Sequence, residues 1–152
     1  MTVLGVAVFA TRSVQGEVTF EPLAGRMRIV AHFTRLPVGK HGFHLHRAGD
    51  LRGEGCKKAC AHYHVGPPQH HGGPPGSKGE RHTGDLGNIS SDRNHYSWIV
   101  KDARIEDLWG RSIIVHGDED DLGLGDADDS LTTGHSGKRI ACAIIGRTMD
   151  CD

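Results

Sequence analysis

The stretch His44-Leu45-His46 is the most informative part of this sequence. Alternate side chains of a β-strand point to the same face, so the two imidazoles would lie side by side. Two imidazoles on one face can bind one metal ion, and imidazole suits copper and zinc. We therefore expect a strand over residues 41–47 that carries part of a metal site.

Seven further segments have the pattern of short β-strands. They are rich in alternating or β-branched apolar residues and are separated by turn-like stretches. No segment shows the period of an amphipathic helix. Eight short strands predict an all-β sandwich or barrel. The seven segments are residues 3–9, 14–20, 27–33, 82–89, 95–101, 112–116 and 139–145.

Two long segments lack any strand pattern, namely residues 48–81 and 117–138. The first is rich in glycine, proline and histidine, and the second is acidic and glycine-rich. Loops of this length in a small domain are usually functional or disordered. Metal-type residues lie inside or beside both, which favours function. The length of 152 residues predicts a single domain over residues 1–152.

Composition excludes several kinds of partner. The net charge is −1, which gives no bulk attraction to nucleic acid or to anionic membrane. No apolar window of about 18 residues exists, so we expect no membrane span. Residues 1–9 lack a basic leader and have the pattern of a strand rather than a signal peptide. We therefore expect a cytoplasmic location.

Six of the twelve histidines, with one aspartate, form the candidate metal set. Its members are His44, His46, His62, His71, His82, Asp85 and His116. Spacing alone does not decide whether His70 or His71 belongs to it. His41 is expected to make structural hydrogen bonds. The other histidines are expected to be ordinary surface or core residues: His32, His64, His70, His95 and His135.

Motifs around these residues follow one another in a specific order. They are Gly42-Phe43-His44-Leu45-His46, His62, His71-Gly72-Gly73-Pro74, His82-Thr83-Gly84-Asp85-Leu86-Gly87-Asn88, Val115-His116, Asp120-Asp121-Leu122-Gly123, Thr133-Gly134, Gly137-Lys138-Arg139-Ile140-Ala141-Cys142 and Ile145-Gly146. This series resembles the copper–zinc superoxide dismutases of the eukaryotic, intracellular type, over nearly the whole chain. The resemblance implies an eight-stranded Greek-key β-barrel or sandwich of immunoglobulin-like architecture, with two long functional loops.

The resemblance also implies the roles of the site residues. The copper ligands would be His44, His46, His62 and His116. The zinc ligands would be His62, His71, His82 and Asp85. His62 would therefore bridge the two metals, and both of its ring nitrogens would be deprotonated.

Three further roles follow from the same resemblance. Asp120 would accept hydrogen bonds from His44 and His71 and orient both rings. Arg139 would bind a small anion beside copper, and Lys138 would add positive potential.

Four cysteines are present, and their number and spacing do not settle whether a bridge forms. They are Cys56, Cys60, Cys142 and Cys151. The resemblance implies a disulfide between Cys56 and Cys142. We expect Cys60 and Cys151 to be free thiols.

The implied activity is disproportionation of superoxide to dioxygen and hydrogen peroxide, with His62 and Arg139 as catalytic residues and zinc in a structural role. A non-catalytic copper- and zinc-binding protein on the same fold is the alternative. A zinc hydrolase is disfavoured, because catalytic zinc usually has three protein ligands and an open position.

The resemblance extends to assembly and to copper supply. It implies a copper-delivery protein and a homodimer, with dimer contacts at Phe9, Leu51, Trp109 and Ile144. Asp118 and Thr132 stand where the family often has lysines, so we expect a shallow dependence of the rate on salt.

Overall fold

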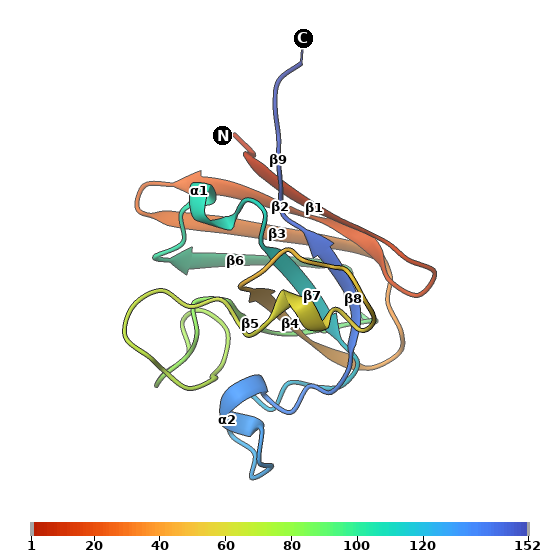
Figure 1. The fold of residues 1–152 in the computed structure, drawn as a ribbon, viewed down its shortest axis with the longest axis vertical. Coiled ribbons are helices and arrows are strands. Elements are labelled where there is room, and N and C mark those ends of the chain that lie inside the picture. Colours follow the sequence, from red (N-terminus) through yellow and green to blue (C-terminus); the bar gives the residue numbers. More distant parts are fainter. Residues whose placement is uncertain (1, 152) are drawn as a thin grey trace.

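Two antiparallel β-sheets pack face to face in the computed structural model, which describes residues 2–151 (Figure 1). One sheet has the strand order β6-β3-β2-β1-β9 and the other has the order β5-β4-β7-β8. The expected all-β sandwich is therefore confirmed. The strands are β1 Gly5–Ala10, β2 Gln15–Leu23, β3 Arg26–Arg35, β4 Lys40–His46, β5 Asp85–Ser90, β6 His95–Lys101, β7 Ser112–His116, β8 Arg139–Ile144 and β9 Gly146–Arg147.

The eight expected strands are present, and most differences lie at their ends. The expected strand over residues 82–89 begins only at Asp85, because the Asp85 N–H closes a turn onto the His82 carbonyl (3.1 Å). The two-residue strand β9 was not expected. It pairs with the start of β1, where Gly5 lies opposite Arg147.

Three one-turn helices interrupt the connections between strands. They are η1 Lys57–Ala59, α1 Ile105–Leu108 and α2 Ser130–Thr133. A single turn is too short to produce a helical period in the sequence, so none of the three was predicted. Among the described residues, no helix has the length and apolar character needed to cross a membrane.

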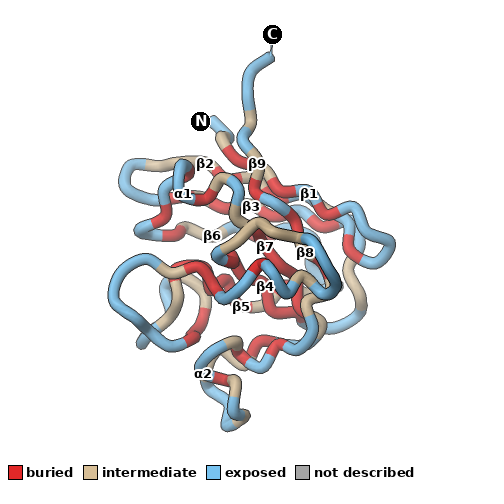
Figure 2. Tube along the Cα trace, in the orientation of Figure 1, coloured by how far each residue is buried: buried red, intermediate tan, exposed pale blue. Residues whose placement is uncertain are grey.

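The core lies between the sheets and contains the inward-facing residues of both layers (Figure 2). At one end the rings of Phe9, Phe33 and Phe43 cluster, with centroids 5.6–6.3 Å apart. Phe9 is only 2% exposed, so its expected place on a dimer surface is wrong. Along β1, Gly5, Ala7 and Phe9 face the core, which directs the Phe9 side chain inward.

The four-stranded sheet positions the two long loops. Strand β4 lies between β5 and β7, and both faces of β4 are buried, because the core covers one face and the loops cover the other. Backbone hydrogen bonds attach both loops to this strand, from the Tyr63 N–H to the Leu45 carbonyl (2.8 Å) and from the Gly42 N–H to the Asp118 carbonyl (3.0 Å). The loops therefore enclose the outer face of β4, on which His44 and His46 lie.

Candidate metal centre

Four imidazoles converge on the loop-covered face of the four-stranded sheet. His44 and His46 alternate with the core residue Leu45 on β4, so both point away from the core. His116 ends the adjacent strand β7, and His62 is held beside His46 by an isolated β-bridge. All four histidines are at least 97% buried.

These four histidines, called the first group below, present four buried nitrogens that have no hydrogen-bond partner among the described residues. They are His44 Nδ1, His46 Nε2, His62 Nε2 and His116 Nε2. The four residues each offer a ligand atom within 4.8 Å of the others. A buried polar atom without a partner costs free energy, so the arrangement calls for a bound group that accepts four lone pairs. A divalent copper ion fits such a set of imidazoles.

The opposite ring nitrogens fix the orientation of these imidazoles. His44 Nε2 donates to Asp120 Oδ2 (2.7 Å), and His46 Nδ1 donates to the Cys60 carbonyl (2.8 Å). When one ring nitrogen donates in this way, the other carries the lone pair. The lone pairs therefore point into the group.

Burial keeps the same rings uncharged. Desolvation, reinforced by the neighbouring imidazoles, lowers the pKa of His44 and His46 well below the usual histidine value. It lowers the pKa of His116 to about 3. Neutral imidazole is the form that binds metals, so the first group is ready for a cation at neutral pH.

A second group lies on the other side of the His62 ring. It consists of His62, His71, His82 and Asp85. The Nδ1 atoms of His62, His71 and His82 lie 2.9 Å, 3.1 Å and 3.4 Å from Asp85 Oδ1. His62 Nδ1 and His71 Nδ1 are 3.3 Å apart. Donors about 2.0–2.1 Å from a tetrahedral zinc ion lie about 3.3–3.4 Å apart, so this group fits zinc.

Asp85 is the anionic member of the second group. Although its burial opposes ionisation, hydrogen bonds with His62, His71 and His82 hold the pKa of its carboxyl well below the usual range. Its second oxygen accepts the backbone N–H groups of Gly72 (3.0 Å) and His82 (2.8 Å). Asp85 is therefore a fixed carboxylate that offers one oxygen to the group.

Asp120 connects the two groups from outside. Its two oxygens accept His44 Nε2 and His71 Nε2, both at 2.7 Å. Burial lowers the pKa of His71, but hydrogen bonds to Asp120 and Asp85 outweigh burial and raise the pKa to about 9. One carboxylate thus orients a ring from each group, as the resemblance implied.

Arg139 lies at the edge of the first group, opposite His116 in the β7–β8 ladder. Its guanidinium donates to the carbonyls of Cys56 (2.8 Å) and Cys60 (2.7 Å). The side chain is half-buried, and burial lowers its pKa from 12.5 without removing its charge at neutral pH. The structure therefore fixes a cation beside the four imidazoles.

A disulfide joins Cys56 to Cys142, 86 residues apart in sequence, as the resemblance implied. It ties the first long loop to β8, three residues after Arg139. Cys60 and Cys151 are free and exposed, as expected.

Other sequence expectations around the centre are also resolved. His71 points into the second group, whereas His70 Nε2 pairs with Glu80 at the surface (2.9 Å). The two ring nitrogens of His41 lie 2.9 Å from the His116 and Pro37 carbonyls, which confirms its structural role.

Sequence reasoning assigned no role to three residues that position the centre. Asn88 on β5 accepts the Asp120 N–H (2.7 Å) and donates to the Asp120 carbonyl (2.9 Å). Gly134 has φ +73°, and a side chain there would collide with Asp120 and His71. The Cys60 carbonyl receives both His46 and Arg139. Asn88 and Gly134 lie in the quoted motifs, whereas a backbone carbonyl leaves no signal in a sequence.

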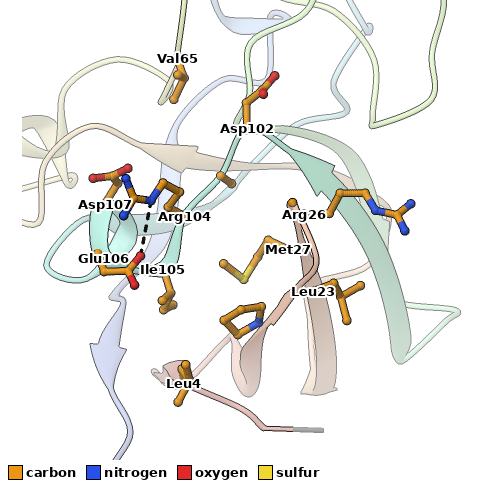
Figure 3. A pocket seen from close by; sticks show the side chains of 13 residues that line it. Leu4, Leu23, Arg26, Met27, Val65, Asp102, Arg104, Ile105, Glu106 and Asp107 are labelled. Atoms are coloured by element: carbon orange, nitrogen blue, oxygen red, sulfur yellow. Dashed lines mark ion pairs between the residues drawn. The ribbon is translucent and has the colours of Figure 1, made fainter.

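A pocket of about 540 Å³ lies elsewhere, between the β2–β3 turn and the segment that leads into α1 (Figure 3). Leu4, Met27 and Ile105 line it, and Arg104 pairs with Glu106 at its rim (3.8 Å). None of its lining residues belongs to the histidine groups. The metal centre is therefore not this pocket.

Comparisons with known proteins agree with this arrangement. Residues 14–145 match the family model described as "Copper/zinc superoxide dismutase (SODC)". A "Superoxide dismutase [Cu-Zn]" from Paramecium bursaria Chlorella virus 1 is 46% identical over 140 residues, covering 88% of this chain and 73% of the relative. An "Extracellular superoxide dismutase [Cu-Zn]" from Caenorhabditis elegans is 39% identical over 137 residues, covering 86% and 60%.

Among solved structures, the crystal structure of the clock protein EA4 superposes with a TM-score of 0.83 at 32% identity, over 97% of this chain and 98% of that one. The β-sandwich with two adjoining histidine groups thus defines a protein built to hold a pair of metal ions. The chain belongs to the copper/zinc superoxide dismutase family.

Proposed function

We propose that this chain disproportionates superoxide at a dinuclear centre in which copper is bound by the first histidine group and zinc by the second. The observation that carries the ligand assignment is the set of four buried, unpartnered nitrogens in the first group. When bound, copper supplies a one-electron carrier with two accessible oxidation states, whereas zinc has no redox chemistry.

His62 is the residue that couples the two groups. Its Nδ1 atom belongs to the Asp85 group and its Nε2 atom to the four-nitrogen group. Two adjacent cations favour removal of both ring protons, because each stabilises the deprotonated form. A proton taken up at Nε2 and later released there would serve the formation of hydrogen peroxide, while Nδ1 keeps the ring in place.

Arg139 is the residue that would bind the substrate anion. Its carbonyl partners, Cys56 and Cys60, fix the guanidinium, and no carboxylate within residues 2–151 forms an ion pair with it. A fixed cation at the edge of a low-dielectric site attracts and orients a small anion. Lys138 precedes it and is exposed, so it adds positive potential at the surface.

The non-catalytic alternative is less consistent with this site. A protein that only stores metal has no need for a guanidinium fixed beside the four-nitrogen group, yet Arg139 is held there by two hydrogen bonds. Stopped-flow measurement of superoxide decay separates the two functions. We expect rapid decay with protein loaded with both metals and no acceleration with protein loaded with zinc alone. Equal decay in the two samples would contradict the proposed activity.

We also propose that the protein is a homodimer. Ile144 is 42% exposed, and Leu51 and Trp109 are half-exposed. Ile144 pairs with Ser112 in the β7–β8 ladder, and the Gly110 N–H bonds to the Ile145 carbonyl (2.9 Å), so this strand end adjoins Trp109. Partly exposed apolar side chains that adjoin one another, as Trp109 and Ile144 do, favour a subunit contact. A monomeric mass at micromolar concentration would overturn this proposal.

A cytoplasmic location and supply of copper by a delivery protein stay predictions. Relatives include a protein named as extracellular, so family membership does not decide location. Fractionation of the native cells, with the protein detected in the cytoplasmic or the secreted fraction, tests the first. Copper content after expression with limiting copper, with and without the candidate delivery protein, tests the second.

A further inference from the structure

Two histidines outside the metal centre lie directly opposite each other on the five-stranded sheet. His32 on β3 pairs with His95 on β6, and both side chains are exposed. The Phe33 N–H donates to the Asn94 carbonyl (2.8 Å) across the same strands. The two types of residue pair alternate along an antiparallel ladder, and this bond joins the neighbouring pair, Phe33 and Asn94. His32–His95 is therefore a non-hydrogen-bonded pair, the type in which opposing side chains are closest.

The two imidazoles already face each other at short range. Their ring centroids are 5.9 Å apart in an edge-to-face arrangement. Within residues 2–151, no side-chain hydrogen bond or ion pair engages either ring, in contrast to His41, His64, His70 and His135. The ring nitrogens of this pair are therefore available to a ligand.

A carboxylate extends the pair into a row across three strands. Glu17 on β2 lies opposite His32, on the same outer face, and its side chain is exposed. The nearby Arg93 is held by the backbone and by an aromatic ring: its Nε donates to the His95 carbonyl (3.1 Å), and its guanidinium stacks over the Tyr96 ring (5.0 Å), whose side chain points to the other face of β6. Two imidazoles and one carboxylate thus stand in line.

We propose that His32 and His95 form a surface site for a divalent late transition-metal ion, to which the carboxylate of Glu17 on the next strand adds negative charge. Imidazole and carboxylate are suitable ligands for copper(II), nickel(II) and zinc(II), and the usual order of affinities places copper(II) first. The two strands fix the backbone spacing of the two histidines before binding, so chelation requires no backbone rearrangement.

This site is separate from the metal centre in the fold. The centre is built on the outer face of β4 and β7 and in their loops, whereas β2, β3 and β6 belong to the opposite sheet. Strand β6 is at the edge of its sheet, paired to β3 alone. A metal ion bound by His32 and His95 would therefore link an edge strand to its neighbour and stabilise the folded chain.

The test uses the full chain loaded with copper and zinc and freed of loosely bound metal. Cys60→Ser and Cys151→Ser in all samples remove the exposed thiols, which would bind copper themselves. Copper(II) chloride is then added, and electron paramagnetic resonance and metal analysis count the further copper bound per chain. The variants are His32→Asn, His95→Asn and Glu17→Gln, with His135→Asn as the control for loss of an exposed histidine that lies outside the row and pairs with Asp129.

We expect one further copper ion per chain in the parent and in His135→Asn, with nitrogen coupling in its spectrum, and none in His32→Asn or His95→Asn. Glu17→Gln should bind it more weakly. The thermal midpoint should rise with added copper only in the proteins that bind it. Unchanged zinc and copper in the centre would show that each variant is folded. The proposal is overturned if the parent binds no further copper, or if both histidine variants bind as much as the parent.

Discussion

At the residue scale, the hydrogen bond made by one ring nitrogen of an imidazole determines whether the other nitrogen can bind a metal ion. His44 and His46 each donate one ring N–H to a fixed oxygen, on Asp120 and on the Cys60 carbonyl, which directs the other nitrogen into the four-nitrogen group. The sequence identified these histidines through spacing and family resemblance. It could not identify the Cys60 carbonyl, because every residue has a main-chain oxygen and the residue type does not show where that oxygen points. The φ angle of Cys60, +66°, is set by the folded loop. Which metal each group holds stays a prediction.

His116 provides the cleanest separation of the two groups, because it belongs to the first alone. We expect His116→Ala to lower copper affinity by more than about 100-fold, beyond the usual effect of losing an outer hydrogen-bond partner. Zinc content should be unchanged and superoxide decay should slow in parallel with copper loss. Metal analysis and stopped-flow kinetics measure both, with His135→Ala as the control. Full copper content and full activity in His116→Ala would show that the ligand assignment is wrong.

Arg139 should affect the rate without affecting metal content. We expect Arg139→Ala to retain both metals and to reduce the second-order rate constant by about tenfold or more, the size of effect that local charge has on anion encounter. Arg139→Lys keeps the charge but loses the two-pronged donor geometry, so it should fall between the parent and Arg139→Ala. Stopped-flow decay at fixed pH measures all three. If Arg139→Ala reacts as fast as the parent, the guanidinium does not guide the anion.

At the element scale, β4 is the strand on which the centre is built. The alternation along residues 41–47 predicts that His44 and His46 share one face, and their arrangement on β4 agrees. The one-turn helices η1 and α2 were beyond prediction, because loop residues such as Lys57 and Ser130 take their conformation from tertiary contacts. Ser130 Oγ, for example, donates to Asp121 Oδ1 (2.9 Å), a contact nine residues away in the chain.

The disulfide connects two of these elements, so its loss should affect both stability and the site. We expect Cys56→Ser to lower the free energy of unfolding of the metal-free protein by about 4 kcal/mol, since the bridge closes a long loop. Cys60→Ser removes an exposed free thiol and should leave stability nearly unchanged. Urea unfolding followed by circular dichroism compares them. An equal, small effect of both substitutions would show that the bridge contributes little to folding stability.

At the scale of the whole molecule, the two sheets have different roles. Both sheets contribute their inward-facing residues to the core, and the four-stranded sheet also carries the metal centre and both long loops. The sequence predicted this sandwich because strand alternation and loop length are local properties. It placed Phe9 on the surface, because a resemblance fixes a position along the chain but not the face that a side chain takes.

Charge around the mouth of the centre should give a weak salt dependence. Asp118 is exposed, and a side chain at Gly137 would meet its carboxylate, which places that charge near Lys138 and Arg139. Screening lengths fall from about 30 Å at 0.01 M salt to about 8 Å at 0.15 M. We expect a shallow fall in rate over this range for the parent. The reaction should become faster and more salt-sensitive from the parent to Asp118→Asn, and again from Asp118→Asn to Asp118→Lys. A steep fall in the parent would contradict this.

The central claim is that one imidazole, that of His62, is shared by two different metal ions. Anomalous X-ray diffraction from crystals of the fully loaded protein, collected at the copper and zinc absorption edges, tests it most directly. We predict a copper peak beside His62 Nε2 and a zinc peak beside His62 Nδ1, with the ring between them. Two peaks with no shared side chain, or the two metals in exchanged positions, would contradict the claim.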